Sequence, residues 1–80
     1  MEKDIRKIIT NIINTIKIDN NSLEKFYCQL SYNYIAYCKD NPGAYIETTA
    51  KIKGNKLYVR GHYHPPCSLK LKQIVFNVPL

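Results

Sequence analysis

The side chains best suited to chemistry gather in residues 61–67, which read GHYHPPC. His62 and His64 are two residues apart, so in a β-strand both imidazoles leave the same face. Cys67 follows after a Pro-Pro turn, and imidazole with thiolate is a donor set that zinc accepts. The spacing matches no standard zinc finger or ribbon, and a fourth ligand would have to come from Cys28, Cys38 or Glu47. We therefore predict no metal, with His62, His64 and Cys67 as the candidates if one binds.

The only conceivable catalytic set combines Cys67 and one of the histidines of this stretch with Glu47 from earlier in the chain. Nothing in the sequence builds an oxyanion hole beside that thiol. The six acids are not spaced as a catalytic pair, and the three glycines are separate turn or strand positions rather than a phosphate loop. We predict that the protein is not an enzyme and uses no cofactor.

Length and composition favour one globular domain spanning residues 1–80 whose function lies on its surface. Eighty residues with 45% apolar and 22% charged side chains suffice for a small core but leave little room for an internal active site. The net charge of +6 favours a polyanionic partner: nucleic acid, an acidic protein face or an anionic membrane surface.

The three cysteines form no CxxC pair, and neither a secretory leader nor a membrane-spanning apolar run is visible. We therefore expect a reduced cytoplasmic protein that does not use a membrane. The frequent Ile, Lys, Asn and Tyr are typical of AT-rich coding sequences. They suggest a phage or mobile-element protein, which would act in the host cytoplasm.

The first half of the chain has helical periodicity. Six isoleucines recur on one face and predict a helix over residues 3–17. A second helix is expected over residues 22–39, with a main apolar stripe that includes Phe26 and Leu30. Cys28, Tyr32 and Ile35 form a second stripe on another side. A helix apolar on two sides is either central in the fold or half-covered by a partner, and we favour the central position.

The second half alternates at period two, as strands do. We expect strands at 44–53, 56–64 and 68–78, with a two-residue turn at Gly54-Asn55. The third strand changes phase between Leu71 and Ile74, which a bulge near residues 72–73 would reconcile. The predicted fold class is α+β: two N-terminal amphipathic helices packed on one face of a three-stranded antiparallel sheet, in the order α-α-β-β-β. One sheet edge should stay open, where a second copy could pair.

The two-residue turn also determines which side chains face outward. Residue 53 should lie opposite 56, residue 51 opposite 58 and residue 45 opposite 64, all pointing away from the apolar face. This outer face is basic with interleaved aromatic rings. Its predicted partner-binding residues are Tyr45, Lys51, Lys53, Tyr58, Arg60, His62, Lys70 and Lys72.

We interpret this surface as that of a non-enzymatic binding protein, an inhibitor or regulator of a host complex that handles nucleic acid, such as a defence complex. Tyr32, Tyr45, Tyr58 and Arg60 would then be the energetic centres of a protein interface. The first alternative is direct binding of DNA or RNA, because cations with stacking rings suit both. The second alternative is a small zinc-stabilised module.

Overall fold

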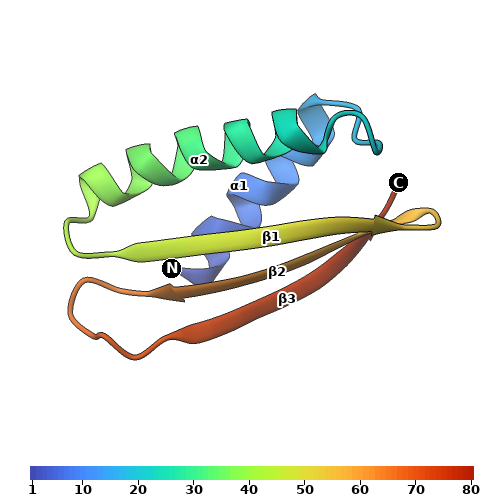
Figure 1. Cartoon of the computed structure of the whole chain (residues 1–80). Coiled ribbons are helices and arrows are strands. Elements are labelled where there is room, and N and C mark those ends of the chain that lie inside the picture. Colours follow the sequence, from blue (N-terminus) through green and yellow to red (C-terminus); the bar gives the residue numbers. More distant parts are fainter.

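The computed structural model describes all 80 residues. Two helices, α1 (Glu2–Thr15) and α2 (Leu23–Asp40), precede the strands β1 (Tyr45–Lys53), β2 (Lys56–His64) and β3 (Lys72–Pro79). The strands form one antiparallel sheet in the order β1-β2-β3 (Figure 1). The predicted α+β fold and its α-α-β-β-β order are confirmed, and apart from the start of β3 every element end lies within two residues of its predicted position.

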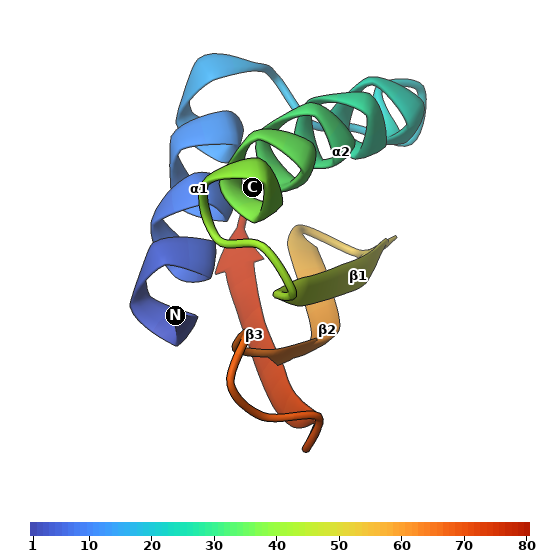
Figure 2. The same ribbon diagram turned by 90° about the vertical axis from the view of Figure 1, so that its left-hand side faces the viewer.

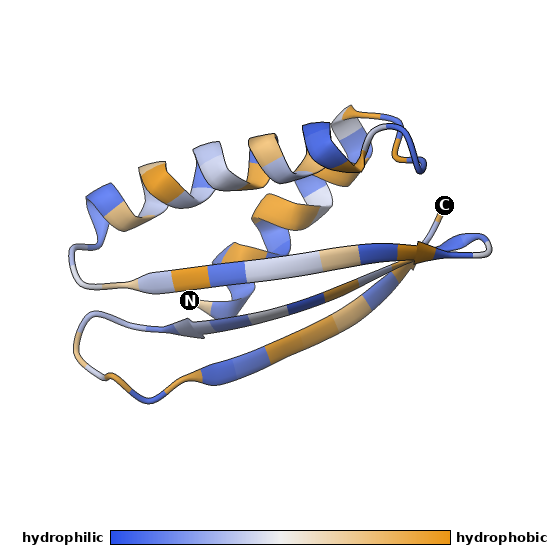
Figure 3. Ribbon diagram, viewed as in Figure 1, coloured by the Kyte–Doolittle hydropathy of each residue, from blue (hydrophilic) through white to orange (hydrophobic).

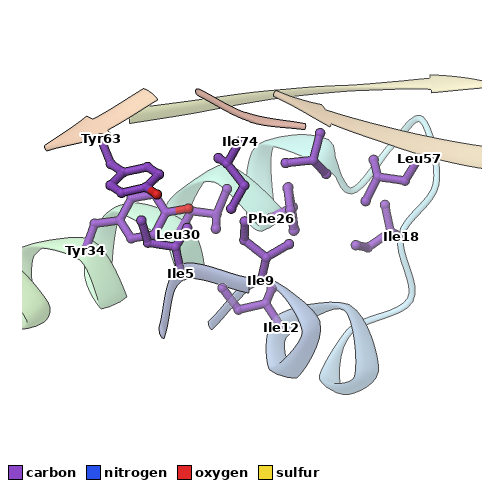
Figure 4. Close-up of a cluster of buried hydrophobic side chains, with 11 residues drawn as sticks. Ile5, Ile9, Ile12, Ile18, Phe26, Leu30, Tyr34, Leu57, Tyr63 and Ile74 are labelled. Carbon is purple, nitrogen blue, oxygen red and sulfur yellow. The ribbon is translucent and has the colours of Figure 1, made fainter. Parts of the chain in front are cut away.

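Both helices lie on the same side of the sheet, so the molecule has two layers (Figure 2). The core fills the space between them, with helix side chains meeting the inward side chains of the sheet (Figure 4). The isoleucines of α1 are β-branched and therefore poor helix formers. Packing against the sheet is what holds this helix. The buried core residues are Ile5, Ile9, Ile12, Ile18, Phe26, Leu30, Tyr34, Leu57, Val59, Tyr63 and Ile74.

Helix α2 is not central in the fold, contrary to the prediction. Its main stripe, with Phe26 and Leu30, is buried, but the second stripe faces away from the sheet. Tyr32 is 76% exposed and Ile35 is 71% exposed. The reason is that a three-stranded sheet offers two helices only one face, so each helix keeps an outer side.

The third strand begins four residues later than predicted. Residues 68–71 form a loop in which Leu69 is 86% exposed and Leu71 is 53% exposed. β2 ends at His64 because Pro65 follows, and Lys72 already lies opposite Tyr63. Residues 68–70 therefore have no residue of β2 to pair with. The register from Lys72 to Pro79 runs without a bulge, so the predicted bulge is wrong.

Tyr27 of α2 reaches across to β1 and fastens it to the helix layer. Its hydroxyl donates a hydrogen bond to the Ala50 carbonyl at 2.6 Å and accepts one from the Ala50 N–H at 2.8 Å. Both backbone groups that Ala50 turns away from β2 are thereby satisfied. The middle of the β1 edge is occupied from within the same chain.

Gly61 sits where the sheet has no room for a side chain. A Cβ at this position would collide with Thr48 Cγ2 and would lie 2.7 Å from the Glu47 carbonyl oxygen. The second obstacle is backbone of the paired strand, which cannot move without disturbing the ladder. We expect Gly61→Ala to lower the free energy of unfolding by about 2 kcal/mol or more, measured by urea denaturation.

Gly54→Asn is the matched control for that substitution. Gly54 has a φ of +59° and nothing lies near its Cβ direction. Asn tolerates the left-handed region, so this variant should change stability by less than about 1 kcal/mol. Equal losses in the two variants would contradict the steric explanation.

Tyr34 should make the free energy of unfolding depend on pH in the alkaline range. Burial raises the pKa of its phenol, although a hydrogen bond with the Thr48 hydroxyl at 3.3 Å opposes the shift. Because the folded pKa lies above the unfolded value of about 10, the contribution is complete below that pH and is lost as pH rises through the folded pKa. Tyr34→Phe should therefore flatten the fall in unfolding free energy as the pH rises above about 10. Parallel curves for the variant and the wild type would refute this assignment.

Candidate interface on the outer face of the sheet

The outer face is built by strand pairing, since residues directly opposite each other in a sheet share one face. The observed β1–β2 register is the one that the turn predicts, from Tyr45 opposite His64 to Lys53 opposite Lys56. Thr49 lies beside Arg60, and Lys51 lies beside Tyr58. The structure therefore brings six of the predicted residues onto one surface: Tyr45, Lys51, Lys53, Tyr58, Arg60 and His62.

The other two predicted residues, Lys70 and Lys72, do not belong to this surface. Lys70 lies in the loop before β3. Lys72 pairs with Tyr63, whose side chain is buried in the core, so Lys72 has the inward parity at the end of the sheet. Their predicted position on the outer face was wrong, because it assumed a third strand from residue 68 and a bulge near residues 72–73, neither of which is present.

β3 instead contributes an uncharged row to the outer face: Gln73, Val75, Asn77 and Pro79. Val75 lies opposite Arg60 and is 53% exposed. Sequence reasoning missed it, although parity counted from the inward Ile74 and Phe76 would have found it.

A shallow hollow of about 510 Å³ lies on this face, larger than the hollows of about 260 Å³ beside α1 and about 210 Å³ between α2 and β1. Tyr58 and Val75 form its apolar part, and Lys51, Lys53 and Arg60 bring positive charge to it. The complete lining is Thr49, Ala50, Lys51, Lys53, Tyr58, Val59, Arg60 and Val75. We call this feature the outer hollow.

The positive charge at the outer hollow is not neutralised by the chain itself. Residues 41–80 hold six of the twelve Lys and Arg but only Glu47 among the six acids, so they carry +5 of the net +6. The ion pairs of the structure join Met1 to Asp4, Arg6 to Glu2 and His62 to Glu47, and none involves a cation of the hollow. Such cations attract an acidic partner.

The opposite end of the outer face has a different character. Tyr45 donates a hydrogen bond to Glu47 at 2.7 Å, and the His62 Nδ1 lies 3.7 Å from the same carboxylate. The hydrogen bond to Glu47, with burial and the carboxylate charge, raises the pKa of Tyr45. Along β1, Glu47 is two residues from Thr49, which lies opposite Arg60, and four residues from Lys51, about 13 Å. Its carboxylate pairs with His62 and forms no ion pair with a cation of the hollow.

Of the residues proposed as centres of a protein interface, Tyr32 is out of place. It lies on α2, in the helix layer, whereas Tyr58 and Arg60 border the outer hollow. Tyr45 shares the face but lies at its far end, six residues from Lys51, about 20 Å along the strand.

The histidine–cysteine stretch is not assembled into a metal site. His62 contacts Glu47, whereas His64 stacks on Tyr45 with ring centroids 5.6 Å apart and has its Nδ1 3.0 Å from the Pro65 carbonyl. Cys67 is exposed in the following loop. No three His, Cys, Asp or Glu side chains converge as metal ligands require.

We therefore expect purified protein to contain far less than one zinc per chain. Its melting temperature should be unchanged by a chelator, because a structural zinc would contribute folding free energy that the chelator removes. Elemental analysis and thermal melts with and without chelator test this. Stoichiometric zinc with a lowered melting temperature would restore the zinc-module hypothesis.

No family model matches this chain, and no curated protein or solved structure matches it either. None of its helices combines the length and the apolar character that crossing a membrane requires.

Proposed function

We propose that this is a non-enzymatic binding protein that holds an acidic segment of a partner protein in the outer hollow. The observation that carries the proposal is the combination of an apolar part, Tyr58 and Val75, with cations that have no acidic partner on the chain. A partner would supply the missing carboxylates together with an apolar side chain.

Each part of the hollow has a role in such binding. Apolar contact with Val75 and the Tyr58 ring removes surface from water, which drives association. Arg60 presents a planar guanidinium that bonds a carboxylate bidentately, and Tyr and Arg are the residue types that dominate binding energy at interfaces. Lys51 and Lys53 accelerate the encounter with an acidic surface.

Direct nucleic-acid binding is the second candidate, and the exposed ring of Tyr58 among cations favours it. A base stacked on that ring would place phosphates near the lysines. Two features favour a protein partner over nucleic acid. The hollow contains a single aromatic ring, and the β3 row beside it is uncharged.

The composition suggests the biological setting of a phage or mobile-element regulator that inhibits a nucleic-acid-handling complex in the host cytoplasm. An acidic surface of such a complex would carry the negative charge that complements the cations of the outer hollow. This setting stays a prediction, to be tested by the partner that is captured.

Charge reversal tests the role of the hollow. We expect Arg60→Glu to weaken binding at least tenfold, because it removes the guanidinium and repels an acidic partner. Lys25→Glu is the matched control: it makes the same change of net charge on an exposed position of α2, in the other layer. Binding of a glutamate-rich peptide and of a single-stranded oligonucleotide of equal charge is measured by fluorescence anisotropy.

Affinity capture from nuclease-treated host lysate, followed by mass spectrometry, then identifies the partner. The proposal predicts proteins that survive nuclease and are lost with Arg60→Glu but kept with Lys25→Glu. Preference for the oligonucleotide together with nuclease-sensitive capture would replace it by the nucleic-acid alternative. Equal losses in both variants would show that only the total charge matters.

A further inference from the structure

The sheet has two edges, β1 and β3, and only the β1 edge is protected by other parts of the chain. At β1, Tyr27 occupies both the N–H and the C=O of Ala50, in the middle of the strand. β1 also carries Glu47, Lys51 and Lys53 along its length, charges that oppose pairing with another strand. β1 is therefore a protected edge.

The bond between Tyr27 and Ala50 also reveals which backbone groups of β3 are free. Ala50 turns its N–H and C=O away from β2, and such positions alternate along antiparallel strands. On β2, the even-numbered residues consequently bond to β1, and the odd-numbered residues bond to β3. The β3 partners of those odd-numbered residues are Lys72, Ile74, Phe76 and Val78. The N–H and C=O groups of Gln73, Val75 and Asn77 therefore point to the open edge.

Nothing in the chain covers this edge. No side-chain hydrogen bond reaches the backbone of residues 72–79. The Leu80 N–H bonds to the Asn55 carbonyl at 2.7 Å, which lies on the β2 side. In Figure 1, β3 is the last element of the sheet, and no strand or helix runs beyond it.

β3 also lacks the usual devices that prevent edge pairing. After Lys72 no residue is charged, and the only proline is Pro79 at its end. Figure 3 shows an apolar run in the middle of β3, where β1 alternates. Four of the eight large exposed hydrophobic residues lie in or beside this strand: Leu69, Leu71, Val75 and Leu80. An edge with no charge after its first residue and an apolar middle is a template for another strand.

We propose that two copies of this chain pair β3 with β3, antiparallel about a two-fold axis at Val75, and form a continuous six-stranded sheet. Val75 would lie opposite Val75 of the partner subunit, and Gln73 opposite Asn77 of the partner subunit. All three residues have their backbone groups directed at the edge, so the pairing forms about six hydrogen bonds. The proposal does not depend on the proposed function.

The strand is complementary to itself in this register, which is why the occupant is a second copy. A two-fold axis makes each contact occur twice, as closed dimers require. Centring on Val75 keeps Pro79, which has no N–H, out of the hydrogen-bonded pairs. Lys72 would lie opposite Val78 of the partner subunit, which is six residues along the strand from the partner subunit's Lys72. The two lysines are then about 20 Å apart, so their charges do not oppose pairing.

Oligomeric state tests the proposal. We expect wild-type protein to sediment at twice the 9.3 kDa chain mass. Val75→Lys places two charges beside the axis and should raise the dimer dissociation constant at least tenfold, whereas Thr49→Lys, with the same charge on the same face but on β1, should leave it unchanged. Mixing Val75→Lys with Val75→Glu should restore dimers, which a misfolded variant would not. A wild-type monomer at millimolar concentration, or equal dissociation constants for the two lysine variants, would overturn the proposal.

Amide hydrogen exchange tests the register separately. The amides of Gln73, Val75 and Asn77 should exchange fast at low protein concentration and become protected as concentration rises. Those of Ile74 and Phe76 should be protected throughout, because they bond to β2. A concentration-dependent protection that appears on β1 instead, or none at all, would refute pairing through β3.

Discussion

The two-residue turn at Gly54-Asn55 is the constraint on which the rest of the structure depends. It sets Lys53 opposite Lys56 and thereby every later pair of β1 and β2. Because side chains alternate at period two, a slip of one residue would exchange the inner and outer faces. The core side chains of the sheet, the close packing at Gly61 and the cations of the outer hollow all follow from this one register.

The position of the helices makes the two edges of the sheet different. They bury the inner face, and the Tyr27 hydroxyl satisfies Ala50 on β1. No side chain of either helix hydrogen-bonds to the backbone of β3, and β3 meets the helix layer through side chains of its inner face, such as the Phe76 ring 4.9 Å from Arg6. The asymmetry of the edges is thus a consequence of where α2 lies.

The outer face gathers charge at one end and hydrogen-bonded groups at the other. Towards the turn, Lys51, Lys53 and Arg60 border an apolar floor, and none of the three forms an ion pair within the chain. At the far end, Glu47 is engaged by Tyr45 and His62. Interfaces commonly place apolar contacts centrally with charged groups around them, and the outer hollow has this composition within one small patch.

By itself the sequence determined the element order, the hairpin register and the outward row of β1 and β2, because periodicity and turn chemistry are local properties. Only the tertiary structure decided where β3 begins, since that depends on where β2 stops offering a partner, and it moved Lys70 and Lys72 off the outer face in favour of Val75. It likewise decided that Tyr32 faces away from the sheet and that β1 is closed while β3 is open. These outcomes depend on contacts between segments far apart in the chain, which no local pattern encodes.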